Sequence, residues 1–505
     1  MSTPIYVGAI DQGTTGTRFM AFDRDGEVAA EAYATHEQYY PKPGWVEHDP
    51  LEIWERTKTV VTDGLSEAGI QPEQLAAIGV TNQRETTLLW DGRTGEPLHN
   101  AIVWQDRRTT ERIEGLEDAG RVEWIRDKTG LKPDAYFSAT KAEWLLEHAT
   151  DRADSAGAGS EDLMLGTIDS WLVYNLTGRH VIDVTNASRT MLFDIHAVEW
   201  DEELLDLFGV PESMLPEVRP SMDPAGFGTT NPEGFLGAEV PVAGVLGDQQ
   251  AALVGHTGFD AGDAKNTYGT GSFLVMNTAE EPVKSQHGLL TTIAFQQAGE
   301  PVQYALEGSI FSTGAAIEWL EEIGLIDSPE ETGSLAEEVN GTDGVFVVPA
   351  FTGLGAPHWD GRARGTIVGL SRGTEREHIA RATLESIGFR TRDVIEAMEQ
   401  DAGLETPELR VDGGAVSSDV LCQLQADLLQ TSIRRPVVDE TTALGAAYSA
   451  GLTVGYWGSV EDLRDNWQID RTFEPTMPAD RADDRYDRWA DAVERSLDWA
   501  RDGDE

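Results

Sequence analysis

The feature that most constrains the fold is a strand–turn–strand pattern rich in Gly and Thr, which occurs twice in the chain. The first copy has strand-like runs on both sides of Asp11-Gln-Gly-Thr-Thr-Gly16, and the second is Lys265–Ser272, followed by strand-like Phe273–Met276. Glycine loops of the P-loop or Rossmann type lead from a strand into a helix. In this chain, β-branched and aromatic residues follow each of the two loops, which predicts a second strand and makes each loop a hairpin tip. Either loop alone predicts only an ordinary hairpin turn. Two copies together predict two related domains.

The length of the chain also indicates two domains. Single domains rarely exceed about 250–300 residues, so a chain of 505 residues is expected to form two large domains with a cleft between them.

Helix signals are strong in the second half of the sequence. The capping-box pattern Thr374–Glu377 predicts a helix that continues to about Met398. The small residues of Thr441–Gly451 predict a closely packed helix, and the acidic tail from Asp480 through Trp499 predicts one amphipathic helix.

The charge of the chain is its strongest compositional signal. Asp and Glu number 89 against 38 Lys and Arg, which gives a formal net charge of −51. This charge makes nucleic acids and anionic membranes poor partners. With 14 Trp and clear periodicity, the carboxylates belong to the surface of a folded protein and not to a disordered one. The pattern resembles that of proteins from salt-accumulating archaea. In molar salt the Debye length is about 3 Å, so repulsion between the surface carboxylates is screened.

The sequence also indicates where the protein is located and which covalent cross-links it can form. No run of about 18 apolar residues predicts a membrane span, and no signal peptide precedes the first strand, so we expect a cytoplasmic protein. The single cysteine, Cys422, excludes an internal disulfide.

Polar residues at the two hairpin tips are suited to phosphoryl transfer. That reaction needs donors around the phosphates, a divalent metal and a carboxylate that accepts the proton of the attacking hydroxyl. Asp11 is the candidate for Mg²⁺, held directly or through water. The amides and hydroxyls of Thr14, Thr15 and Thr270 could surround the phosphates, and Arg18 adds a fixed cation.

The candidate general base is Asp248, at the point where a predicted strand ends and a helix of small residues begins. An aspartate at such a position is most often an N-cap, and this alternative stays open. Arg84 and Glu85 follow the apolar strand 77–80, where buried charges would be costly without a partner or ligand. A guanidinium beside a carboxylate fits a vicinal diol, although a surface ion pair is the simpler alternative. Trp104 and Phe273 could form apolar walls or simply belong to a core.

Several motifs together resemble the FGGY carbohydrate kinase family over nearly the whole chain, from Tyr6 to about Trp499. The resemblance rests on these segments, in this order: Asp11–Thr15, Tyr40–Pro50, Thr81–Thr87, Phe137–Trp144, Thr185–Phe193, Gly247–Ala252, Pro349–Pro357, Gly365–Leu370, His378–Ile379 and Ala382–Glu385. Single motifs of this kind would be weak evidence, but their number and order make a chance similarity untenable.

The resemblance implies an α/β fold of two actin-like (ribonuclease H-like) domains, 1–254 and 255–505, with an interdomain cleft for ATP and Mg²⁺. It implies phosphorylation of glycerol, with glycerol and phosphate contacts in the first domain and nucleotide contacts and the acidic C-terminal helix in the second. The residues implied for glycerol are Arg84, Glu85, Tyr136, Asp248 as general base, and Gln249. The residues implied for the nucleotide are Thr14, Thr15, Gly16, Arg18, Thr270, Gly314, Glu318, Gly414 and Ser418. Glu318 and Ser418 depart from the commoner Gln and Asn, which affects contacts on the adenine side.

Other functions remain open at this point. Another FGGY kinase for a longer polyol or a pentulose would need a wider pocket than Trp104 and Phe273 suggest. The actin-like fold also serves filaments and chaperone-type ATPases, which have no use for Arg84, Glu85 or Tyr136. We also expect a homo-oligomer, a dimer or a tetramer.

Overall fold

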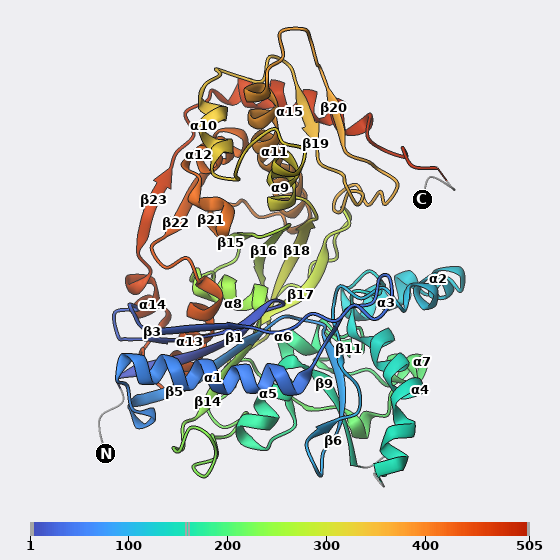
Figure 1. The fold of residues 1–505 in the computed structure, drawn as a ribbon, viewed down its shortest axis with the longest axis vertical. Coiled ribbons are helices and arrows are strands. Elements are labelled where there is room, and N and C mark those ends of the chain that lie inside the picture. Colours follow the sequence, from blue (N-terminus) through green and yellow to red (C-terminus); the bar gives the residue numbers. More distant parts are fainter. Residues whose placement is uncertain (1–4, 157–158, 160–161, 502–505) are drawn as a thin grey trace.

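The computed structural model describes residues 5–156, 159 and 162–501, and these form two α/β halves, each built on a mixed sheet (Figure 1). The five strands of the first sheet run in the order β14-β5-β1-β2-β3. Their bounds are Tyr6–Gln12 for β1, Gly16–Phe22 for β2, Val28–Thr35 for β3, Leu75–Asn82 for β5 and Val242–Gly247 for β14. The second sheet has the order β17-β18-β16-β15-β21-β22-β23. Its strands are β15 (Ala264–Tyr268), β16 (Ser272–Ala279), β17 (Leu290–Phe295), β18 (Gln303–Ile310), β21 (Glu408–Asp412), β22 (Ser432–Pro436) and β23 (Ile469–Phe473).

The two sheets share one topology. In the first, β1, β2 and β3 form an antiparallel meander while β5 and β14 run parallel to β1. In the second, β15, β16 and β18 are the corresponding antiparallel strands, with β17 inserted between β16 and β18 in the sequence and paired at the edge, while β21 and β22 run parallel to β15. Both Gly/Thr loops are hairpin tips, closed by hydrogen bonds from Gly13 N to Gly16 O (2.9 Å) and from Gly269 N to Gly271 O (2.8 Å). The expectation of two related domains built on hairpins is confirmed.

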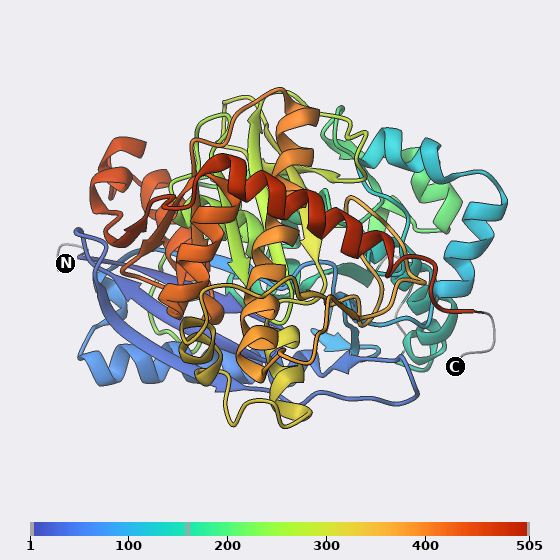
Figure 2. The ribbon, with the colours of Figure 1, turned by 90° about the horizontal axis from the view of Figure 1, so that it is seen from above.

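The helices of the second half differ in detail from the sequence signals. The helix α11 (Arg376–Ala402) begins one residue later than predicted, because Glu375 is the N-cap and forms the capping box with His378. The C-terminal helix α15 (Ala479–Glu494) lies across α11 (Figure 2), where Trp489 is buried. It ends before Trp499, which is 66% exposed, so the prediction that Trp499 belongs to this helix is wrong.

One helix from the second half of the sequence covers the first sheet. The helix α13 (Thr441–Thr453) packs on β5 and β14 and on α8 (Asp248–Gly255). Glycine is required at this contact, because an added Cβ at Gly445 would overlap the carbonyl of Ala251. The close packing predicted from small residues is therefore present, and it fixes α8. The expected division between residues 254 and 255 falls in the last turn of α8 and stays a prediction.

A smaller sheet completes the first half and supports one wall of the site. Its order is β4-β8-β6-β7, and β9 pairs with β6. Its strands are β4 (Glu47–His48), β6 (Thr87–Asp91), β7 (Glu96–Pro97), β8 (Ala101–Ile102) and β9 (Leu163–Thr167). Within the described residues, no helix is both long enough and apolar enough to cross a membrane.

Candidate active site

Parallel strands bring the predicted polar residues to one edge of the first sheet. In the register of β1, β5 and β14, Gln12 and Gly247 both lie opposite Asn82. The chain leaves β5 into Arg84 and leaves β14 into Asp248, so both side chains stand beyond the carboxyl ends of their strands. Ligands of open α/β sheets bind at such an edge.

A cavity of about 130 Å³ lies at this edge, and eight of the predicted site residues line it. They are Thr14, Arg84, Glu85, Trp104, Tyr136, Asp248, Gln249 and Phe273. Phe273 comes from β16 of the second half, and the other seven come from the first half. The cavity is small beside the roughly 300–1,000 Å³ of drug-sized ligand sites, so it suits a small molecule.

The turn after β5 places two charges inside the protein. Arg84 is 3% exposed and Glu85 is 1% exposed, so the interpretation of these residues as a surface ion pair is wrong. Glu85 has φ 59°, in the left-handed region, and strained backbone of this kind clusters at functional sites. Arg84 Nε lies 3.1 Å from Asp248 Oδ1 and 3.9 Å from Glu85 Oε1.

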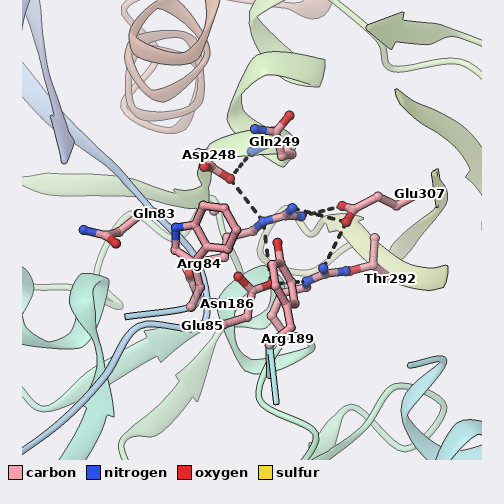
Figure 3. A network of polar contacts seen from close by, with 12 residues as sticks. Gln83, Arg84, Glu85, Asn186, Arg189, Asp248, Gln249, Thr292 and Glu307 are labelled. Carbon is pink, nitrogen blue, oxygen red and sulfur yellow. Dashed lines mark hydrogen bonds and ion pairs between the residues drawn. The ribbon is translucent and has the colours of Figure 1, made fainter. Parts of the chain in front are cut away.

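Two further charged residues complete this network, and neither was identified from the sequence. Glu307, on β18, contacts Arg84 Nη1 through Oε2 at 2.5 Å and Arg84 Nη2 through Oε1 at 3.2 Å (Figure 3). Arg189 donates from Nη2 to Glu307 Oε1 at 2.9 Å and from Nε to Glu85 Oε1 at 2.7 Å. The signal that could have found Glu307 is its carboxylate, the one charged group within the mostly apolar run Tyr304–Ile310.

These ion pairs set the protonation of the network. Burial opposes ionisation of Glu307, but Arg189 and Arg84 outweigh it and hold its pKa at about 2. Burial would lower the pKa of Arg84, yet Glu307 and the neighbouring groups raise it well above its usual value. The pKa of Glu85 is raised, because burial outweighs the attraction of Arg189 and Arg84.

Asp248 faces the cavity and does not cap its helix. The N-cap of α8 is Gly247, without a side-chain cap hydrogen bond, so the N-cap alternative for Asp248 is wrong. The Asp248 side chain is 30% exposed, and its Oδ1 accepts a hydrogen bond from Gln249 N at 2.7 Å. Gln249 is in turn fixed from the second half, because Lys265 Nζ donates to its Oε1 at 2.5 Å.

The aromatic wall of the cavity is held by buried and partly buried hydrogen bonds. Trp104 and Tyr136 meet edge to face with ring centroids 5.4 Å apart, and Trp104 Nε1 donates to Thr14 Oγ1 at 3.0 Å. Lys141 lies in α4 (Ser138–Ala156), and its Nζ donates to three successive carbonyls of residues 135–137. These bonds fix the segment that carries Tyr136.

Asp11 interacts electrostatically with Asp248, which lines the cavity, and it suits a cation. Burial raises the pKa of its carboxyl to about 7, Asp248 adds to the rise, and Arg18 opposes it. A bound cation would favour the ionised form of Asp11, and carboxylate oxygens are the ligands that Mg²⁺ prefers. Arg18 forms ion pairs with Glu440 and, at 3.7 Å, with Glu31. In the described part of the chain, no group of three or more His, Cys, Asp or Glu forms a metal cluster on its own.

The remaining predicted nucleotide contacts lie near the second sheet, at or beyond its hairpin tip and strand ends. They are Thr270 at the hairpin tip, Gly314 and Glu318 on α9 (Gly314–Glu322), Gly414 after β21, and Ser418 at the N-cap of α12 (Asp419–Leu429). Gly314 N donates to Gly269 O at 3.1 Å, so the tip and α9 are adjacent. Gly413 has φ 90° and lies against the backbone of Tyr268.

The first hairpin tip holds Thr15 and Gly16. Thr15 is exposed, whereas Gly16 is buried, and an added Cβ there would lie 2.6 Å from both the Ala34 carbonyl oxygen and the Tyr33 hydroxyl oxygen. This close approach accounts for the glycine at position 16.

Known proteins resemble the chain over its full length. The models of the N-terminal and C-terminal domains of the FGGY family of carbohydrate kinases match residues 6–255 and 264–454. A glycerol kinase of Haloquadratum walsbyi is 67% identical over 98% of this chain and 99% of its own length. A glycerol kinase of Petrotoga mobilis is 54% identical over 98% and 99%.

A solved structure agrees with these relatives. The crystal structure of Plasmodium falciparum glycerol kinase with ADP matches with a TM-score of 0.91 and 37% identity, over 97% of this chain and 98% of that one. The duplicated sheet, the full-length relatives and both domain models therefore agree that this chain belongs to the FGGY family of carbohydrate kinases.

Proposed function

We propose that this protein is a glycerol kinase, which transfers the γ-phosphoryl group of ATP to glycerol and forms sn-glycerol 3-phosphate. The observation that carries the proposal is the cavity of about 130 Å³, where Arg84, Glu85 and Asp248 meet beside the first hairpin. Its size suits a three-carbon polyol, and full-length relatives bear the name glycerol kinase.

Each side chain in the cavity has a role in this proposal. Arg84 and Glu85 bind vicinal hydroxyls, because the guanidinium donates and the carboxylate accepts hydrogen bonds. Trp104 and Phe273 pack against the carbon chain and exclude water. Asp248 accepts the proton of the attacking glycerol hydroxyl while the oxygen of that hydroxyl bonds to the γ-phosphorus. ADP leaves with the electron pair of the broken P–O bond.

The phosphate side of the reaction rests on the two hairpins. Backbone amides and hydroxyls of Thr14, Thr15 and Thr270 donate to the phosphate oxygens. Asp11 would hold Mg²⁺, directly or through water, and the metal neutralises charge on the phosphates when it is bound. We further propose that Gly314, Gly414, Glu318 and Ser418 surround the nucleoside.

Steady-state kinetics with a panel of polyols tests the proposal. ADP release is coupled to a reporter reaction with ATP and glycerol, dihydroxyacetone, erythritol or xylulose in molar KCl. We expect kcat/KM to be highest for glycerol, because a longer chain exceeds the cavity. Preference for xylulose would support a pentulose kinase instead, and ADP release that ignores every polyol would support an actin-like ATPase.

Three further properties stay predictions. We propose that the protein is cytoplasmic, that it forms a homo-oligomer, a dimer or a tetramer, and that it binds no nucleic acid. Light scattering on the protein in molar KCl gives its mass and tests the oligomeric state.

A further inference from the structure

The ion-pair network behind the cavity joins the two halves of the molecule. Arg84, Glu85 and Arg189 belong to the first half, whereas Glu307 belongs to β18 of the second sheet. Glu307 lies between the two guanidinium groups and contacts both (Figure 3). The side chains of all four are at most 2% exposed. None of the interactions within this group is therefore weakened by solvent as a surface ion pair would be.

The geometry assigns opposite ends of the Arg84 guanidinium to different partners. Glu307 contacts the Nη1 and Nη2 groups, while Nε lies on the side of Asp248 and Glu85. A two-point contact fixes the plane of a guanidinium as well as its position. With Glu307 in place, the guanidinium plane is fixed by groups that do not line the cavity, so its orientation does not depend on the ligand.

Arg189 extends the same support to Glu85. It joins Glu85 Oε1 to Glu307 Oε1, so one residue of the second half orients both polyol-binding charges, one of them directly and the other through Arg189. Neither Arg189 nor Glu307 lines the cavity.

We infer that Glu307 is a positioning residue that orients Arg84 and, through Arg189, Glu85, so that the polyol pocket is complete only while β18 of the second half is docked against the first half. This inference rests on the proposed function. It predicts a role in glycerol affinity for a residue that does not touch glycerol. Without Glu307, the Nη groups of Arg84 would lose their two-point contact. They could then turn toward Asp248, which Nε already contacts at 3.1 Å, and compete with the polyol for that carboxylate.

The variant that tests this is Glu307→Gln, which keeps the shape of the side chain and removes its charge. We expect KM for glycerol to rise about 10- to 100-fold, the range for losing a charged hydrogen-bond pair, and KM for ATP to stay within about twofold. Glu307→Asp keeps the charge but is one methylene shorter, so we expect it to recover part of the affinity. It also provides the measurement if Glu307→Gln does not fold.

Glu385→Gln is the matched control. Glu385 is also 1% exposed and also binds two arginines, Arg381 and Arg485, but it lies in α11 away from the cavity. Both Gln variants should lower Tm, and only Glu307→Gln should raise KM for glycerol. An equal KM effect in both would mean that Glu307 acts only through stability and would overturn the inference.

A double-mutant cycle tests whether Glu307 acts through Arg84. In the Arg84→Ala background, Glu307→Gln should raise KM for glycerol by a clearly smaller factor than in the wild-type background, because only the route through Arg189 to Glu85 remains. Fully additive effects, or an unchanged KM in the single Glu307→Gln variant, would overturn the inference while wild-type turnover of glycerol still supports the proposed function. A wild-type protein without glycerol-dependent turnover would overturn both.

Discussion

Replacing Asp248 with asparagine separates chemistry from binding at this site. The amide keeps an oxygen that can accept from Gln249 N and from Arg84 Nε, which Asp248 Oδ1 contacts at 2.7 and 3.1 Å. Arg84 also remains bound by Glu307, so the polyol-binding groups stay in place. We therefore expect KM for glycerol to stay within about threefold, since ground-state contacts are retained.

The loss should fall on kcat instead. An amide cannot accept the hydroxyl proton, and a positioned general base contributes about 10²–10⁴ in rate, or about 3–5 kcal/mol of barrier. Initial rates of coupled ADP release at saturating ATP and varied glycerol give both constants. Asp201→Asn is the control, because Asp201 caps α7 (Glu202–Phe208) away from the cavity and should keep kcat. Wild-type turnover in Asp248→Asn would refute the assignment of the base.

Three further results follow from the site and the surface. Arg84→Ala should raise KM for glycerol about 100-fold, because a hydrogen-bond donor to the polyol is lost. It should also lower the free energy of unfolding by about 3–5 kcal/mol, because Glu307 loses a buried partner. An unchanged KM would show that Arg84 does not bind glycerol. Phe273→Ala should raise the ratio of kcat/KM for erythritol over glycerol about tenfold by widening the cavity, and an unchanged ratio would exclude Phe273 as a wall. Tm should rise between 0.15 M and molar KCl, because the Debye length falls from about 8 to about 3 Å and the repulsion within a net charge of −51 is screened. A flat or falling Tm would contradict the interpretation of the acidic surface as an adaptation to salt.

Local sequence rules were sufficient for the elements that carry the site. Gly/Thr turns between β-branched runs predicted both hairpins, and the apolar strands before Arg84 and Asp248 placed these residues at strand ends. Parallel pairing of β1, β5 and β14 then brings those ends together. For this reason, side chains predicted one motif at a time line one cavity, together with Tyr136 and Gln249, which only the family resemblance implied.

The rest depended on contacts between distant segments. Glu307 is 223 residues from Arg84 in the sequence, and no local pattern states which guanidinium a buried carboxylate meets. Arg189 follows the buried helix α6 (Val184–Ala187), and its partners come from two other elements. The end of α15 was misplaced for a related reason. Trp499 continues the acidic, aromatic composition of the helix, but it is exposed, and the backbone amides of Asp498 and Ala500 donate to Asp360 and Arg362 instead of continuing the helix.

The destination of the γ-phosphoryl group tests the central claim most directly. The protein is incubated in molar KCl with Mg²⁺ and ATP labelled in the γ-phosphate, with and without glycerol, and the products are separated. We predict that label appears in a glycerol phosphate, in equal amount to the ADP formed, and that little label leaves ATP when glycerol is absent. Label released as inorganic phosphate at the same rate with and without glycerol would contradict the assignment of this cavity to glycerol phosphorylation.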